Sequence, residues 1–283
     1  MKILFSVVHH WNPHGDGNHQ SLRPNPQPRI EALKHQLISL RRLGKNQSYL
    51  HLADRSVYPA NTDFRSDVTI DIVTDGVHHV LDYLPQSFGS SFNHIHCSLE
   101  EPRLLGFEVH KHLQASLQLD YDWFCYLEDD LVVHDPYFLS KLIWFENTFG
   151  PDCVLLPQRV EYASEPNQVD RFYIDGPIDN NELSKLVRPG PVRLINSPSG
   201  PAAFQPALNP HAGCFFLSRR QLEFWVDQPH WLDYDTSFVS PLESAATLGL
   251  AKTFSIFKPC LSTAGWLEIQ HYGNNFHLLI KEC

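Results

Sequence analysis

The sequence predicts an α/β fold with a mostly parallel central sheet flanked by helices. Short apolar runs alternate with segments of helical periodicity through the first half of the chain, as in successive βαβ units. The run over residues 122–127 is almost wholly apolar, which is typical of a strand buried on both faces. No internal repeat and no charged or glycine-serine linker interrupts the chain, so we expect residues 1–283 to form a single domain.

The first half is expected to alternate strands and helices in regular order. The predicted strands are short, apolar and bounded by turn residues, and cover residues 2–8, 49–53, 68–73 and 122–127. The predicted helices carry apolar residues at helical spacing and cover residues 28–44, 100–117 and 135–148. The last of these opens with Asp135 and Pro136, an N-cap followed by proline at the first helical position. Glu128, Asp129 and Asp130 are therefore expected at the carboxyl end of a central strand.

The second half is predicted to be less regular. Its expected strands cover residues 154–157, 171–174 and 211–217. Helices are expected to open at Ser218, where Gln221 completes a capping box, and at Ser240. Residues 188–210 contain six prolines and are expected to form a long loop. We therefore expect an irregular C-terminal region beside the regular sheet.

Composition excludes some partners and suggests a compartment. Twenty-two Lys and Arg against 32 Asp and Glu give a formal charge of −10, which argues against nucleic acid or an anionic membrane as the main partner. The six cysteines include no CxxC pair, and four lie in or beside apolar runs, as small buried side chains do in a reducing compartment. No apolar run approaches the ~20 residues of a transmembrane helix. These features predict a cytoplasmic protein without a transmembrane segment.

The acidic triplet Glu128-Asp129-Asp130 is the strongest chemical signal in the sequence. Three carboxylates gathered at the end of a buried strand raise one another's pKa and resist desolvation, and a bound cation removes that penalty. Mg²⁺ or Mn²⁺ takes oxygen ligands and can bridge them to a diphosphate. Such an ion stabilises a nucleoside diphosphate as a leaving group. An acidic turn between a strand and a helix is the alternative explanation.

With its preceding strand and following helix, the triplet resembles the DxD metal motif of GT-A glycosyltransferases, here in a Glu-Asp-Asp form. The resemblance covers roughly the first half of the chain. It implies a GT-A-like fold in which residues 1–150 bind a nucleotide sugar and residues 151–283 bind the acceptor. The implied activity is metal-dependent transfer of a sugar from a UDP- or GDP-sugar to a glycan, a lipid-linked acceptor or a small molecule, with Mn²⁺ or Mg²⁺ as cofactor.

The resemblance also implies roles for individual residues. Asp130 is expected to bind the metal directly, with Asp129 near the metal and the donor ribose or sugar, and Glu128 orienting the site. His271, in a turn-like Gln-His-Tyr-Gly-Asn segment, is expected as a further metal ligand, although a histidine in an ordinary turn would look the same. The remaining donor-side candidates are His9 after the first strand, Asp54 ending the second predicted strand, Gly213, Arg29 and Arg103. A plain strand entry would explain Gly213 equally well, and either arginine could instead be a solvated surface cation.

An inverting enzyme of this type needs a general base near the acceptor hydroxyl. Glu243 resembles that carboxylate, and Asp235 is a second candidate. Ser240 and Glu243 also fit a capping box, in which the glutamate only satisfies a backbone N–H group. A retaining enzyme would need no such base, so the stereochemical outcome stays open.

Other functions remain possible on the same residues. A metal-dependent phosphoesterase is suggested by the histidine-rich stretch of residues 9–19. A sugar nucleotidyltransferase would use a related sheet and a metal, but its glycine-rich basic loop after the first strand is not found. A non-catalytic carbohydrate-binding module on the same fold would bind a nucleotide sugar without turning it over.

Overall fold

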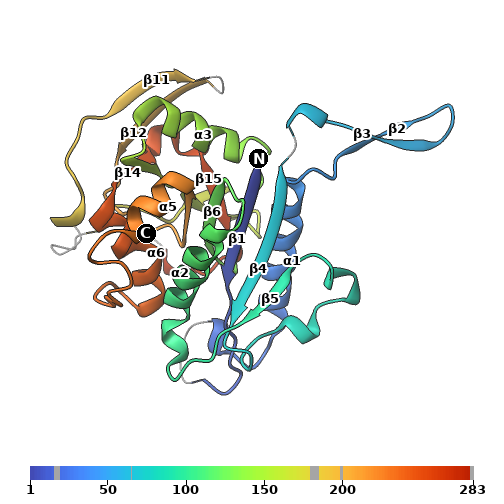
Figure 1. Cartoon of the computed structure of the whole chain (residues 1–283), viewed down its shortest axis with the longest axis horizontal. Coiled ribbons are helices and arrows are strands. Elements are labelled where there is room, and N and C mark those ends of the chain that lie inside the picture. Colours follow the sequence, from blue (N-terminus) through green and yellow to red (C-terminus); the bar gives the residue numbers. More distant parts are fainter. Residues whose placement is uncertain (16–19, 65, 179–184, 198–199, 281–283) are drawn as a thin grey trace.

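The computed structural model describes residues 1–15, 20–64, 66–178, 185–197 and 200–280, and shows a mixed α/β architecture (Figure 1). The described helices are α1 (Gln27–Arg42), α2 (Leu105–Ala115), α3 (Phe138–Phe149), α5 (Arg219–Val226) and α6 (Pro241–Thr253). The described strands are β1 (Lys2–Val8), β2 (Ser48–His51), β3 (Ser56–Pro59), β4 (Asp67–Thr74), β5 (Asn93–His96), β6 (Trp123–Glu128), β7 (Leu131–Val132), β8 (Cys153–Leu155), β9 (Gln158–Tyr162), β10 (Arg171–Tyr173), β11 (Arg193–Ser197), β12 (Gly200–Pro206), β13 (Cys214–Ser218), β14 (Ser255–Pro259) and β15 (Glu268–His271).

The central sheet has the order β13-β6-β1-β4-β5 and confirms the mostly parallel arrangement. Strands β6, β1, β4 and β5 run parallel, and β13 joins β6 in the opposite direction. Helix α1 packs against β4, whereas α2 packs against β1 and β4 and contacts α6, so helices flank the sheet (Figure 1). Because β13 comes from the second half of the chain, that half contributes a strand to the sheet that the first half builds.

The second half is more regular than its sequence indicates. Strands β10-β9-β15-β7 form one further sheet, and β11-β12-β14-β8 form another. Most of the proline-rich stretch predicted as a loop is the β11–β12 hairpin, in which Arg193 pairs with Phe204. Pro201 and Pro206 lie near the two ends of β12, where a missing backbone N–H interrupts the sheet least. The apolar core runs continuously from the first strand to β15.

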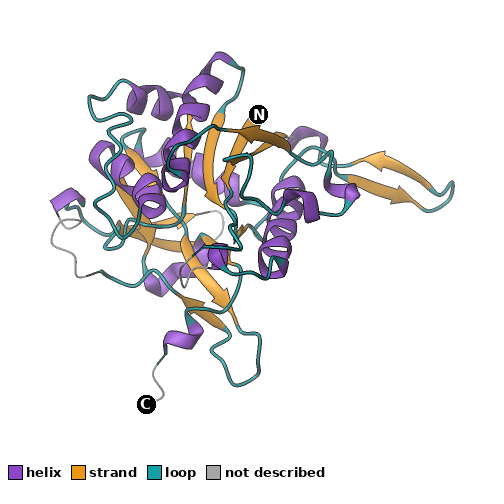
Figure 2. Cartoon of the chain, turned by 90° about the horizontal axis from the view of Figure 1, so that it is seen from below, coloured by secondary structure: helices purple, strands orange, loops and turns teal. Residues whose placement is uncertain are grey.

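The prediction that residues 49–53 form a strand of the parallel sheet is wrong. Residues 48–59 form an exposed antiparallel hairpin, β2–β3, that projects from the body of the molecule (Figures 1 and 2). Asp54 lies in the turn of this hairpin, where it pairs with His51 at 2.9 Å. The second strand of the parallel sheet is instead β4, which ends beside Asp75.

The sequence predicted buried, unpaired cysteines and no transmembrane helix. Cys125, Cys153, Cys214 and Cys260 are buried and unpaired, as predicted. None of the described helices combines the length and the apolar character required to cross a bilayer.

Candidate functional site

The site begins where three parallel strands end together. Val8 of β1 lies level with Glu128 of β6 and with Val73 of β4. Beyond these strand ends, the buried His9 donates from Nδ1 to Asp129 Oδ2 at 2.5 Å, while its Nε2 accepts the Val80 N–H at 3.0 Å. Because Nε2 accepts, the neutral ring carries its proton on Nδ1. The carboxyl edge of a parallel sheet is the usual place for a ligand in such folds.

Arg29 reaches the same edge from the first turn of α1. Its guanidinium pairs with Asp129 and lies 3.2 Å from Asp130 Oδ2. Burial would raise the pKa of Asp129, but Arg29 and His9 hold it below its usual value. Both Asp129 oxygens therefore have protein partners, and this carboxylate positions Arg29 and His9.

Strand pairing brings His271 to Asp130. The chain turns from β6 into β7, and β7 pairs with β15 so that Leu131 faces His271. The Tyr272 N–H donates to the Asp130 carbonyl at 2.7 Å, and His271 Nε2 lies 3.7 Å from Asp130 Oδ2. The sequence-predicted metal residues Asp130 and His271 are thus neighbours, although 141 positions separate them.

Glu161 fixes the orientation of His271. Strand β9 runs parallel beside β15, and Glu161 Oε1 accepts from His271 Nδ1 at 3.1 Å. This leaves the lone pair of Nε2 directed toward Asp130. Burial would raise the pKa of Glu161, but hydrogen bonds from His271, Phe276 and His277 keep it below its usual value. Sequence analysis missed Glu161, because an acid inside a short strand gives no signal of its burial.

Glu128 lies against the backbone of Gly213. The Glu128 N–H donates to the Gly213 carbonyl at 2.9 Å, where β13 meets β6. Gly213 has φ +62°, and a Cβ there would lie 2.7 Å from Glu128 Oε2. Burial, followed by repulsion from Asp130, raises the pKa of Glu128 to about 8. Gly213 therefore makes room for a carboxylate that strongly resists ionisation without a cation.

Glu243 stands across from Glu128, in the first turn of α6. Ser240 makes no side-chain cap hydrogen bond, so the capping-box alternative for Glu243 is not realised. Glu243 is close enough to Glu128 and Tyr126 to raise the pKa of both, after the larger effect of burial. We call Glu128, Asp129, Asp130 and Glu243 the acidic cluster.

Several sequence candidates lie elsewhere. Asp235 pairs with Lys252 at 2.7 Å, and hydrogen bonds led by that of Lys252 lower its pKa to about 2, which makes it a weak base. Asp54 lies on the β2–β3 hairpin, away from the strand ends because that hairpin is separate from the central sheet. Arg103 is exposed in the 3₁₀ turn Pro102–Leu104, and the described residues give it no contact with the acidic cluster. Residues 16–19 of the suggested phosphoesterase segment lie outside the described residues.

The donor set around Asp130 fits a divalent cation. Among the described residues, Glu128 Oε1, Asp130 Oδ1 and Glu243 Oε2 are buried oxygens without a hydrogen-bond partner. Such atoms are expensive to desolvate, and hard cations take carboxylate oxygens with or without an imidazole. Asp130 and His271, with Glu128 beside them, are therefore candidates to hold Mn²⁺ or Mg²⁺, although their ligand atoms are not among the described groups of three that all lie within 4.8 Å of one another.

Comparison with known proteins adds little. The chain matches no protein-family model and no curated protein. Among solved structures it is similar to S. aureus TarS 1–349 in complex with UDP, at 10% identity and a TM-score of 0.44. That match covers 91% of this chain and 57% of the other, so this chain spans little more than half the length of that structure. A likeness of this size assigns neither family nor activity, which have to be inferred from the site.

Proposed function

We propose that this chain is a GT-A-type glycosyltransferase that uses a divalent metal to transfer a sugar from a UDP- or GDP-sugar. One observation carries the proposal: Glu128, Asp130 and Glu243 present buried, unpartnered oxygens at the carboxyl edge of a parallel sheet. A purely structural acidic turn would satisfy these atoms or expose them to water. The acceptor, a glycan, a lipid-linked sugar or a small molecule, would bind on the side formed by residues 151–283.

The metal-binding part of the proposal rests on Asp130, His271 and Glu128. Bound there, Mn²⁺ or Mg²⁺ would supply Lewis-acid stabilisation of the diphosphate leaving group. Glu161 keeps the His271 imidazole in the tautomer that offers Nε2. Asp129 holds the Arg29 guanidinium at the same edge, within reach of an anionic donor.

Glu243 is the proposed general base for an inverting reaction. Its Oε2 has no described partner, whereas both acids of the Asp233–Asp235 pair are bound to Lys252. A carboxylate with an unpartnered oxygen close to Glu128 is suitably placed to accept a proton from an acceptor hydroxyl. In this proposal Asp130 and Glu128 act on the donor side as metal ligands, and Glu243 acts on the acceptor side as the base.

Calorimetric titration of the full chain with UDP and with GDP, each with and without Mn²⁺, tests the donor site. We expect one nucleotide to bind in a Mn²⁺-dependent manner. Asp130→Asn should weaken that binding at least about 100-fold, since it removes a direct ligand. Asp120→Asn is the matched control, because it makes the same change at the opposite end of β6, on a side chain that is 88% exposed and pairs with Lys2.

The alternatives give different results. Absence of binding by both nucleotides, with and without Mn²⁺, would reject the transferase and favour the phosphoesterase. Metal-dependent binding without any hydrolysis of the matching nucleotide sugar, even over long incubation without acceptor, would instead indicate a binding module. Slow hydrolysis that Asp130→Asn abolishes supports the enzyme.

A further inference from the structure

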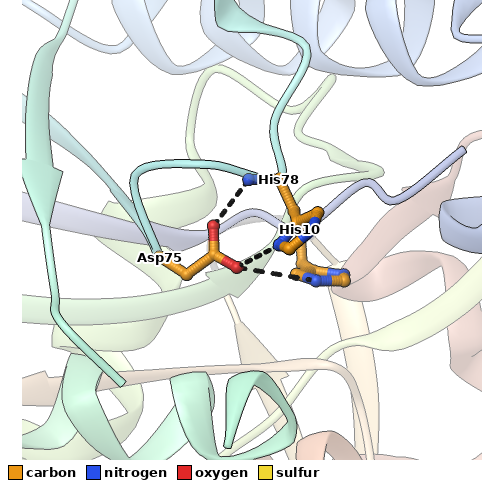
Figure 3. A group of neighbouring side chains, drawn as sticks. All are labelled: His10, Asp75 and His78. Carbon is orange, nitrogen blue, oxygen red and sulfur yellow. Dashed lines mark hydrogen bonds and ion pairs between the residues drawn. The ribbon is translucent and has the colours of Figure 1, made fainter. Parts of the chain in front are cut away.

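A second group of ligand-type side chains lies beside the acidic cluster and has no part in the proposed reaction. His10 follows β1, and Asp75 and His78 lie in the turn after β4 (Figure 3). One ligand atom from each residue lies within 4.8 Å of the others. Parallel pairing of β1 with β4 explains the meeting, because it places the two strand ends at one level.

Asp75 is held rigidly by its own turn. Its Oδ1 accepts the N–H groups of Val77 at 3.0 Å and of His78 at 2.7 Å. Its other oxygen, Oδ2, faces both imidazoles, at 2.7 Å from His78 Nδ1 and 3.9 Å from His10 Nε2 (Figure 3). One oxygen therefore fixes the loop, and the other is hydrogen-bonded to His78 Nδ1, a contact that metal binding would replace.

The protonation states suit metal binding. Burial raises the pKa of Asp75, but hydrogen bonds from the His78 backbone and ring outweigh it and lower the pKa to about 2. Burial lowers the pKa of His10, which favours the neutral ring. The group thus contains an ionised carboxylate and imidazoles whose neutral forms bind metals.

We propose that His10, Asp75 and His78 form a second divalent metal site, of the two-histidine, one-carboxylate type, that prefers Zn²⁺ over Mg²⁺. Imidazole nitrogen favours zinc and similar transition metals, whereas Mg²⁺ prefers oxygen alone. Zinc bonds of about 2.0–2.2 Å hold ligand atoms roughly 3.3 Å apart, so only small side-chain movements are needed. The imidazoles are 25% and 34% exposed, which leaves a coordination position open to water or to an anionic group.

This site is independent of the one proposed for sugar transfer. Consecutive residues point to different partners: His9 contacts Asp129, and His10 contacts Asp75. The Trp11 N–H donates to the His78 carbonyl at 2.9 Å and keeps the two loops together. A zinc ion here would cross-link the ends of β1 and β4, whether or not Asp130 binds a metal.

Zinc titration of the metal-free full chain tests the proposal, with Co²⁺ absorption as a second readout. To remove the other candidate site, the titration uses Asp130→Asn as background. In this background we expect one equivalent of Zn²⁺ to bind, and His10→Gln or His78→Gln to weaken that binding more than about tenfold. Excess Mg²⁺ should not displace the zinc. Circular dichroism checks that each variant is folded.

His51→Gln is the matched control. His51 and Asp54 also form a His–Asp pair three residues apart, at 2.9 Å, but on the exposed hairpin and outside the three-residue groups able to hold a metal among the described residues. This variant should bind zinc as its background does. Equal zinc affinity and stoichiometry in the background, His10→Gln and His78→Gln proteins would show that the group is only a hydrogen-bonded turn. If the wild-type chain binds neither UDP nor GDP while the background still binds this zinc equivalent, the proposed transferase alone is rejected.

Discussion

Two buried charged regions lie side by side in this protein and are built on opposite principles. The closed network consists of Arg159, Asp175 and Lys258. Asp175 accepts from Arg159 Nε at 2.9 Å and from Lys258 Nζ at 2.7 Å, and Lys258 also donates to the His211 carbonyl at 2.5 Å. In the acidic cluster, by contrast, three carboxylate oxygens have no described partner.

The difference separates structural charge from functional charge. In the closed network, two cations lower the pKa of Asp175 far below its usual value despite complete burial. In the acidic cluster, burial and neighbouring acids raise the pKa of Glu128 to about 8. A buried group that has its counter-charge, as Asp175 and also Asp129 do, is part of the scaffold, whereas Glu128, whose pKa stays raised despite Arg159, would be stabilised in its charged form by a cation from outside.

The largest expected effect is a loss of stability when a substitution disrupts the closed network. Asp175→Asn removes the carboxylate that both Arg159 and Lys258 contact, leaving Arg159 only the more distant Glu128 and Asp130, and should lower the free energy of unfolding by about 3–5 kcal/mol. Glu128→Gln is the matched control in the acidic cluster. Because the folded pKa of Glu128 is raised, its ionisation destabilises the fold above its unfolded pKa. Urea unfolding at pH 7 should therefore show equal or higher stability for Glu128→Gln. A loss as large as that of Asp175→Asn would contradict the distinction.

A buried histidine shows that an unpartnered atom alone does not make a site. His110 is enclosed by aromatic rings including Trp225 and Trp231, and among the described residues its Nε2 has no partner. Burial lowers its pKa to about 4, so the ring stays neutral in the fold. Stability is then fully present above the unfolded pKa of about 6.5, and about 3 kcal/mol should be lost as the pH falls through this window to 4.

The measurement compares urea unfolding at pH 7 and pH 4.5 for the wild type and His110→Phe. The variant loses the hydrogen bond of the His110 ring to the Ala245 backbone at every pH, but its stability should fall less between the two values. Other buried histidines also make the free energy of unfolding depend on pH. The difference between the two proteins in this pH dependence therefore isolates the contribution of His110. If both proteins lose equal stability between pH 7 and pH 4.5, the His110 ring is in contact with water, and it is then no example of a buried atom without a partner.

The sequence predicted the strands and helices that carry the site, but not the residues that position its side chains. The strand before Glu128 and the helix carrying Arg29 have strong local signals, and the acids at the strand end followed from them. Asp75 was missed, because the strand beside the first one was assigned to residues 49–53, ending at Asp54, whereas it is the predicted strand of residues 68–73 that pairs with β1 and ends beside Asp75. Glu161 and Arg159 depend on the parallel pairing of β9 with β15, a non-local contact that no short window contains.

Glu161→Gln tests whether positioning matters in the acidic cluster. The amide can still accept from His271 Nδ1, but without the charge that polarises the ring. We expect Mn²⁺-dependent nucleotide binding to weaken about 10–100-fold, or about 1.4–2.7 kcal/mol. The effect should be smaller than that of Asp130→Asn. The control is Glu268→Gln, which alters an acid on β15, the strand that carries His271, where Glu268 pairs with Arg171. Equal effects of the two variants would reduce Glu161 to a general structural role.

The smallest effect concerns the space beside Glu128. Gly213→Ala places a side chain at φ +62°, which costs about 1 kcal/mol of stability, and its Cβ would displace Glu128 Oε2. Gly150→Ala is the matched control, because φ there is +90° and nothing lies within 4 Å of the added Cβ. Both variants should lose stability in urea, Gly150→Ala the more because its ψ of 167° belongs to a region that essentially only glycine adopts, but only Gly213→Ala should also weaken Mn²⁺-dependent nucleotide binding. Unchanged binding in Gly213→Ala would mean that Glu128 can move aside freely, and metal binding would then depend on Asp130 and His271 without it.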